Sequence, residues 1–222
     1  MKRRVAVFFL LMLLGLPSLS LGEASTGIYL APKFLMMLQN TGTLERSHAV
    51  PGTGGSYSQF ALGGALAAGY DFWPMHLLPI RTEIEFALRG NSEKSWSSGW
   101  GETKGFWNTS TLFANVFWDF HNATQFTPYV GAGLGVAFNY AGYDIHRHFG
   151  NSFSMDDRFV NFAWNIGAGA AYNFNENIAV DASYRYADFG YTEVESYVGG
   201  HKYEIGARPY NHEFSLGLRY TF

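Results

Sequence analysis

The chain of 222 residues contains no cysteine. That absence excludes a disulfide framework, a thiolate metal site, a cysteine nucleophile and a lipid-modified cysteine. Beyond its N-terminal stretch the chain also lacks an apolar run of the ~20 residues that a membrane-spanning helix needs. The length suits one domain. An exported chain without disulfides needs another source of stability, and a closed hydrogen-bonded barrel is one.

The N-terminus predicts a secretory signal peptide. Three basic residues precede an apolar run from Val5 to Leu14, and a break follows at Pro17. Ser20 and Gly22 fit the small-residue positions of a cleavage site, so we expect a cleaved signal peptide over residues 1–22 and one transmembrane barrel domain over residues 23–222. The alternative is a membrane-anchor helix, for which the apolar run is short.

The chain has no excess of positive charge. Its net charge is −3, and loss of Lys2, Arg3 and Arg4 with the signal peptide lowers this to −6 (−3 minus 3). This balance argues against nucleic acid as a partner.

Aromatic residues and glycine are abundant, at 18% and 26 of 222 residues. Apolar residues recur at every second position in eight segments, which indicates strands, and the i, i+3, i+4 spacing of helices is absent from them. Alternation of this kind is compatible with a membrane only in a barrel, because each strand then faces lipid on one side alone. The segments are 26–39, 58–72, 80–89, 111–120, 130–139, 161–172, 178–186 and 213–222.

The breaks between these segments are alternately short and long. Residues 73–79, 121–125 and 175–177 form short breaks, and residues 40–57, 90–105, 142–158 and 187–209 form long ones. This layout predicts an all-β fold, an eight-stranded antiparallel transmembrane β-barrel with short periplasmic turns and four long extracellular loops. A soluble lipocalin-like barrel or sandwich is the alternative, with its apolar residues inside.

The aromatic residues favour the membrane barrel. They gather at the short-turn ends of the segments, where a girdle of amphipathic rings lies at the level of the lipid headgroups. We expect this girdle to contain Tyr70, Phe72, Trp73, Trp118, Phe120, Tyr172, Phe174, Tyr220 and Phe222.

The opposite face of the segments is polar and is expected to fill the barrel. An eight-stranded barrel is just wide enough to be filled by side chains. Cations and anions roughly balance, as a buried network requires, since an unpaired charge there costs several kcal/mol. Glycines at 131, 133, 135, 167 and 169 are expected to leave volume for long Arg and Glu side chains. A proton or ion path, or an enzyme site, is the alternative. The predicted inward set is Lys33, Arg81, Glu83, Glu85, Arg89, Asn115, Asp181, Arg185, Glu213 and Arg219.

Four stretches resemble the opacity-type, outer-membrane protein A-like family of eight-stranded barrels. They are residues 127–136, 164–172, 181–186 and 214–222. The resemblance implies a bacterial outer membrane, with membrane lipid and lipopolysaccharide as neighbours. It also implies that the terminal aromatic Phe222 is the signal recognised by the barrel-assembly machinery. Members of the family include adhesins and surface antigens, whose functions reside in the extracellular loops.

Two features of the expected loops are candidates for binding. His146 and His148, with carboxylates nearby in sequence, form a possible divalent-metal site or a solvated polar loop. Trp96 and Trp100 are possible contacts for a host or surface ligand, or they fold back onto the barrel rim.

Three functions follow from this pattern. The first is a structural or adhesin role carried by the loops, the second a narrow porin-like channel, and the third a lipid A-modifying enzyme. The deacylases among such enzymes carry a His-x-Ser pair, which this chain lacks; His212 and Ser215 are three residues apart and point to opposite faces. We therefore expect no enzyme activity, no cofactor and no resident metal.

Overall fold

A computed structural model describes residues 26–47, 55–148, 152–198 and 200–222. The expected signal peptide, residues 1–22, lies outside the described residues. Within the described part of the chain, the structure contains no helix that is both long enough and apolar enough to cross a membrane.

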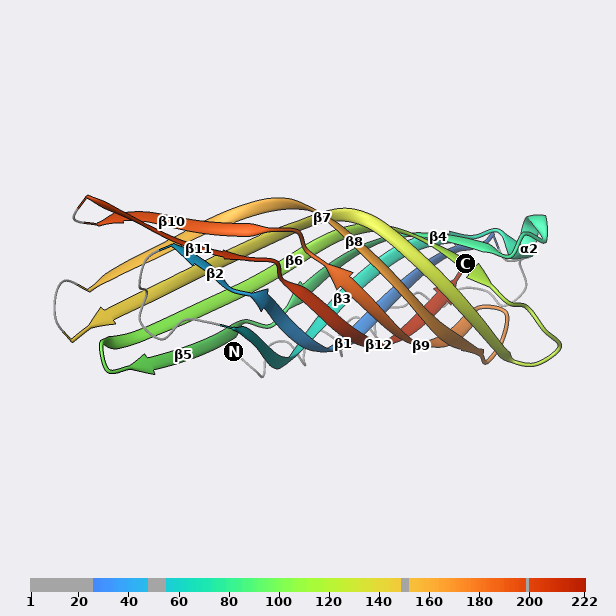
Figure 1. Cartoon of the computed structure of the whole chain (residues 1–222). Coiled ribbons are helices and arrows are strands. Elements are labelled where there is room, and N and C mark those ends of the chain that lie inside the picture. The colour runs from blue at the N-terminus through green and yellow to red at the C-terminus, as the bar shows by residue number, and fades with distance from the viewer. Residues whose placement is uncertain (1–25, 48–54, 149–151, 199) are drawn as a thin grey trace.

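Eight strands form a closed antiparallel barrel (Figure 1). Each pairs with its neighbour in the chain, and pairing of the last strand with the first closes the ring, from Tyr29 opposite Thr221 to Asn40 opposite Tyr210. The predicted fold class is confirmed. The strands are β1 (Ile28–Thr43), β3 (Ser56–Asp71), β4 (Ile80–Arg89), β6 (Gly101–Asp119), β7 (Phe126–Arg147), β8 (Phe153–Asn173), β9 (Ile178–Asp188) and β12 (Tyr210–Thr221).

Burial along β4 shows how the alternating sequence is used. Ile84 and Phe86 are 55% and 45% exposed, whereas the carboxylate residues Glu83 and Glu85 are 4% and 1% exposed. Apolar groups therefore face outward and charges face inward. This is the reverse of a soluble protein and the arrangement that lipid requires.

Three short connections close one end of the barrel. The first contains the single-turn helix α2 (Trp73–His76), and the others span residues 120–125 and 174–177. At the same end the backbone N–H of Thr26 donates to the carbonyl of Phe222 at 2.6 Å. The two ends of the described barrel therefore meet at the short-turn end, and Figure 1 places the C-terminus beside α2.

The four long connections lie at the other end, and most of their described residues form strands and not irregular loops. β6, β7 and β8 continue well past the barrel, and four further strands accompany them. These are β2 (Glu45–Ser47), β5 (Ser92–Ser98), β10 (Thr192–Val198) and β11 (His201–Ala207). Strands outside the membrane face water, so they lack the apolar outer face that identified the other strands in the sequence.

The described residues within 44–47, 92–107, 141–159 and 191–207 form what we call the outer extension. Its interior is apolar. The buried members are Leu44, Ala141, Tyr143, Ile145, Met155, Val194, Tyr203, Ile205 and Ala207, with Trp96, Trp107, Phe153 and Phe159 packed against them. The polarity of the tube thus reverses along its axis, from a charged interior within the membrane to an apolar interior outside it.

Candidate functional site

Five cations and five anions pair inside the barrel. They come from β1, β4, β6, β9 and β12, and their formal charges cancel. The structure places all ten residues of the predicted inward set in this interior. It adds Asp119, which the sequence prediction omitted although Asp119 lies on the inward face of its strand. The ion-paired residues are Lys33, Arg81, Arg89, Arg185, Arg219, Glu83, Glu85, Asp119, Asp181 and Glu213.

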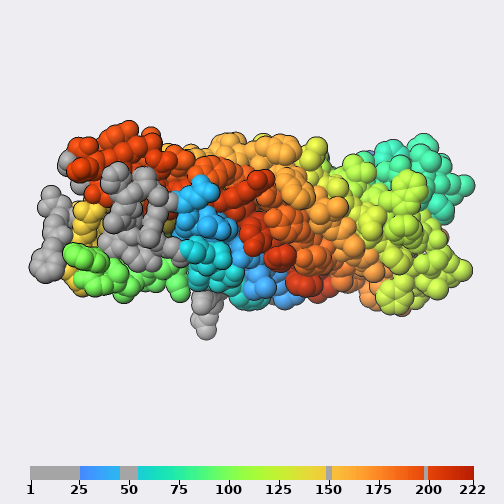
Figure 2. Space-filling model, in the orientation of Figure 1, coloured from blue at the N-terminus to red at the C-terminus, as the bar shows by residue number. Residues whose placement is uncertain are grey.

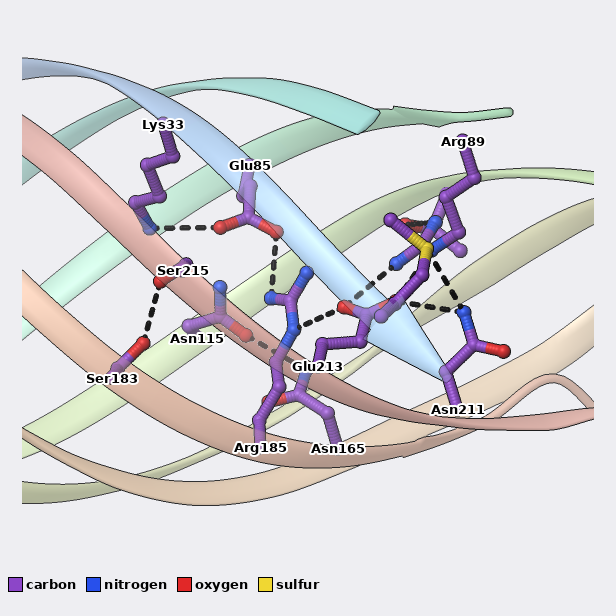
Figure 3. Close-up of polar contacts among 12 residues, drawn as sticks. Lys33, Glu85, Arg89, Asn115, Asn165, Ser183, Arg185, Asn211, Glu213 and Ser215 are labelled. Carbon is purple, nitrogen blue, oxygen red and sulfur yellow. Dashed lines mark hydrogen bonds and ion pairs between the residues drawn. The ribbon is translucent and has the colours of Figure 1, made fainter. Parts of the chain in front are cut away.

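The centre of the network is a continuous chain of ion pairs (Figure 3). Lys33 Nζ lies 2.6 Å from a carboxylate oxygen of Glu83 and 2.7 Å from one of Glu85. The other oxygen of Glu85 accepts a hydrogen bond from Arg185 Nη1 at 2.6 Å. Glu85 of β4 is therefore held between a cation from β1 and a cation from β9.

The chain continues toward the outer extension. Arg185 Nε donates to Glu213 at 2.7 Å, and Arg89 donates to both oxygens of Glu213, at 2.6 and 3.2 Å. Thr111 accepts from Arg89 at 3.0 Å, and the side-chain amide of Asn211 donates to Glu213 at 2.9 Å. Every carboxylate oxygen here has a partner, which is the condition under which buried charges are tolerated.

A second layer lies nearer the short-turn end. Arg81 donates to both carboxylate oxygens of Asp119, at 2.7 and 3.1 Å. Its guanidinium carbon also lies 4.9 Å from the ring centroid of Phe117 and 4.8 Å from that of Tyr129. The sequence prediction did not include Phe117 and Tyr129 among the residues of the interior. The strict alternation of β6 and β7 is the sequence signal that could have identified them as inward-facing.

Glycines give room to side chains of the adjoining strands. A Cβ on Gly133 would overlap the Asn115 amide, which itself accepts a hydrogen bond from Asn165 at 3.0 Å. Gly131 and Gly169 similarly face aromatic rings of the interior, and only Gly167 contacts a long charged side chain, Arg185. The nearest neighbours of these glycines thus lie on the adjoining strands, whereas Gly131 and Gly167 also line the cavity that Arg81, Glu85 and Arg185 border.

The interior leaves a cavity of about 40 Å³. That volume accommodates a few water molecules. Asp181 Oδ1, Arg185 Nη2 and Arg219 Nη1 belong to residues that line it, and these three buried atoms have no hydrogen-bond partner in the protein. The cavity is a small polar pocket within the charge network and does not have the dimensions of a channel.

The aromatics of the expected girdle lie at the short-turn end. Trp118, Phe120, Phe174 and Phe222 are exposed, and Tyr70, Phe72, Trp73, Tyr172 and Tyr220 are partly buried. Most of these rings pack in edge-to-face pairs, such as Tyr220 with Phe222 at 5.1 Å between centroids. Trp73 instead stacks on His121 at 3.8 Å.

The four predicted contact residues of the outer end separate into two groups. Trp96 packs edge-on against Trp107 at 5.7 Å and belongs to the apolar interior of the outer extension, so it is a packing residue and not an exposed contact. Trp100 is 76% exposed, and His146 and His148 are exposed on the neighbouring strand end. The backbone N–H of His148 donates to the Trp100 carbonyl at 3.1 Å, which brings this second group together.

Among the described residues, no group of carboxylates lies close enough to His146 and His148 to form a metal-binding cluster with them. In that part of the chain, three groups of the metal-binding type converge within 4.8 Å at Glu193, Glu195 and Glu204. Lys202 already contacts Glu195 at 2.5 Å and Glu204 at 3.1 Å. A hydrogen bond with Glu204 raises the pKa of Glu193.

The interior of the outer extension excludes water. Trp107 Nε1 donates to the Tyr143 hydroxyl at 3.2 Å, and Tyr143 is 2% exposed. Burial raises the pKa of Tyr143 to about 12. The outer extension is thus a packed structure and not a set of solvated loops.

Comparison with known proteins agrees with this architecture. The family model described as an outer membrane protein beta-barrel domain matches residues 6–222. Outer membrane protein PagN of Salmonella typhimurium is 33% identical over 173 residues, covering 72% of each chain. Neisserial surface protein A (NspA) is 18% identical with a TM-score of 0.52, covering 90% of this chain and 100% of that one. OprG of Pseudomonas aeruginosa is 16% identical with a TM-score of 0.50, covering 88% and 97%.

At such low identity the two solved structures show a shared fold alone. The family model, however, spans nearly the whole chain, and the relationship to PagN extends over most of both sequences. The chain therefore belongs to the outer membrane protein beta-barrel domain family and is a β-barrel surface protein of the bacterial outer membrane.

Proposed function

We propose that this protein is an adhesin-type interaction protein, in which the closed barrel supports the outer extension and the outer extension binds the partner. The observation that carries the proposal is the apolar interior shared by all four outer connections. Leu44 comes from the first, Trp96 from the second, Tyr143 from the third and Ile205 from the fourth. A common interior holds the four connections in one fixed arrangement, which is how a binding surface is pre-organised.

The filled barrel supports this assignment over a channel. Five buried cations are matched by five anions, and the cavity between them is about 40 Å³. Moving an ion through this interior would require breaking buried, hydrogen-bonded ion pairs, each costing about 3–5 kcal/mol to disrupt.

Exposed aromatic side chains on the outer extension are the candidate contacts. Trp100 is 76% exposed, Tyr197 71% and Tyr191 47%. Large aromatic groups are the residues that most often dominate protein interfaces, and they are disfavoured in water without a partner. The proposed ligand is a macromolecule on a host or neighbouring cell surface. The same end of the barrel faces lipopolysaccharide, a second expected neighbour.

An enzymatic role is not part of the proposal. The His212 ring lies on the outer surface, with Nδ1 2.7 Å from the Tyr184 hydroxyl. Ser215 lies on the inner side, with its hydroxyl 2.6 Å from that of Ser183. The two groups point to opposite sides of the barrel wall, so they do not form a nucleophile and base.

We also propose that Phe222 serves assembly. Its side chain is 37% exposed and its ring packs on Tyr220, while its backbone N–H donates to the carbonyl of Ile28 at 2.9 Å. Phe222 thus lies at the seam where β12 meets β1.

The test is attachment of bacteria displaying the protein to a monolayer of cultured mammalian cells. Replacing both Trp100 and Tyr197 by alanine should reduce attachment about tenfold or more, the effect of losing ~1.4 kcal/mol at a binding hot spot. Phe174→Ala, which removes a ring that is 59% exposed at the periplasmic end, is the control and should have no effect. Wild-type display without attachment, or equal attachment by the double variant, contradicts the proposal.

A further inference from the structure

The connection between β3 and β4, residues 72–79, differs in character from the other two short turns. Its sequence is Phe-Trp-Pro-Met-His-Leu-Leu-Pro, whereas residues 121–125 and 175–177 are largely polar. Met75, Leu77 and Leu78 are 61%, 71% and 48% exposed. Three neighbouring exposed apolar side chains are unusual for a turn in water and indicate a contact surface.

Part of this turn contacts the lipid-facing row of β3. Tyr70 continues the outward-facing row of β3, and its hydroxyl lies 3.3 Å from Met75 Sδ. The ring of Phe72 packs on Tyr70 at 4.7 Å and lies 6.1 Å from the His76 ring. In Figure 2 the turn stands at one end of the molecule, drawn in teal.

Leu77 has a left-handed backbone conformation, which glycine adopts more easily than leucine. Leu77 ends α2 with a φ of 53°, and its N–H donates to the Trp73 carbonyl at 3.0 Å. Only glycine adopts this left-handed conformation without a steric cost. The most exposed of the three apolar side chains thus lies at a strained position, which points to a use for that side chain.

The apolar surface continues from the turn onto the barrel wall. An open hollow of about 460 Å³ begins at Ile80, directly after the turn. It is lined on the outer surface mainly by Ile80, Val116, Trp118, Val130, Ala132 and Ile166. The turn is therefore continuous with the surface that contacts membrane lipid.

We propose that residues 73–79 form an interfacial anchor, which inserts Met75, Leu77 and Leu78 among the phospholipids of the inner leaflet. The occupant is phospholipid because the turn lies at the periplasmic end, away from the lipopolysaccharide of the outer leaflet. A turn that bends outward beside the aromatic girdle reaches the headgroup and upper acyl region, where amphipathic segments bind. The anchor holds the barrel at a fixed depth, independently of what the outer extension binds.

The absence of cysteine allows a direct test by single spin labels. Met75→Cys and Leu78→Cys each carry one label in full-length protein reconstituted into phosphatidylethanolamine–phosphatidylglycerol vesicles. Collision of the label with oxygen, which concentrates in lipid, is compared with collision with a water-soluble nickel complex. The oxygen-to-nickel ratio at positions 75 and 78 should approach that of Ile84→Cys, a lipid-facing position that is 55% exposed.

Ala123→Cys and Glu176→Cys in the two polar turns are the matched controls. Their oxygen-to-nickel ratio should be several-fold lower than that at positions 75 and 78. Ratios at 75 and 78 equal to those of the controls overturn the proposal and leave a periplasmic protein as the partner of this surface. Two labelled positions are used so that a misfolded variant at one of them leaves the other to decide.

Discussion

Arg89 and Glu213 meet inside the barrel in a two-pronged ion pair, with Nε 2.6 Å from one carboxylate oxygen and Nη2 3.2 Å from the other. Both side chains are completely buried, and the residues are 124 positions apart in the sequence. Glu213 also binds Arg185, so one carboxylate compensates two guanidinium groups. This pair links β4 to β12 across the interior and makes the charge network a structural element of the barrel.

Glu213→Gln should destabilise the barrel by about 3–5 kcal/mol, because it leaves two buried guanidinium groups with too little negative charge. The measurement is urea-induced unfolding in lipid vesicles, followed by tryptophan fluorescence. Glu204→Gln makes the same chemical change at a partly exposed position of the outer extension. That control should change the free energy of unfolding by less than ~1 kcal/mol, and equal effects of the two variants would argue against the network's structural role.

Gly133→Ala should destabilise the barrel by about 1–3 kcal/mol, because the new methyl group overlaps the Asn115 amide and forces the interior to move. Gly99→Ala is the control, since a Cβ at Gly99 meets nothing within 4 Å. Both variants are compared by their urea midpoints. A neutral Gly133→Ala would mean that the interior is loosely packed at this level.

Ile205→Ala should loosen the outer extension while leaving the transmembrane barrel folded. Ile205 is 1% exposed, and its truncation leaves a cavity at a cost of about 2–5 kcal/mol. Trypsin should then cleave at Lys202 or Arg208 in intact cells, while the heat-dependent gel mobility of the barrel is retained. Tyr197→Ala, at an exposed site, should keep the resistance of the wild type; cleavage of both variants at the same rate would show that the extension has no common core.

His121 should titrate below the ordinary histidine range. Burial against Trp73 lowers its pKa, so the folded protein takes up this proton less readily than the unfolded chain. The contribution of the neutral ring to stability is therefore complete above pH ~6.5, and it is lost as the pH falls from that value through the lowered folded pKa. NMR titration of the labelled ring measures this pKa, and a midpoint at or above that of a His-containing peptide contradicts the expected burial.

The sequence predicts the barrel strands because lipid forces apolar groups outward at every second position. It predicts which side chains face inward for the same reason, but not which partners they meet. The alternation that places Arg89 and Glu213 inside carries no information about their depth, which depends on the stagger of the strands around the barrel.

The strands and apolar interior of the outer extension could not be predicted from the sequence for a related reason. Tyr143 and Ile145 continue the alternation of β7 and face the interior of the tube. Beyond the membrane, however, the inward face of the strand is apolar and the outward face is polar, which is the opposite of the pattern within the membrane. The Gly-, Ser- and charge-rich composition of such a segment is also that of a loop. Trp96 was a candidate contact on this basis, and only the packing of several outer connections together shows that it faces inward.

Ion conductance across a planar bilayer containing the refolded protein is the most direct measure of whether the interior is closed and function is confined to the outer extension. A barrel filled by five cations and five anions, joined in seven ion pairs, should produce no steady current above that of the bare bilayer. Stable conductance steps whose ion selectivity changes in Glu83→Gln would show that water and ions pass along the charged residues, and would make the barrel a channel.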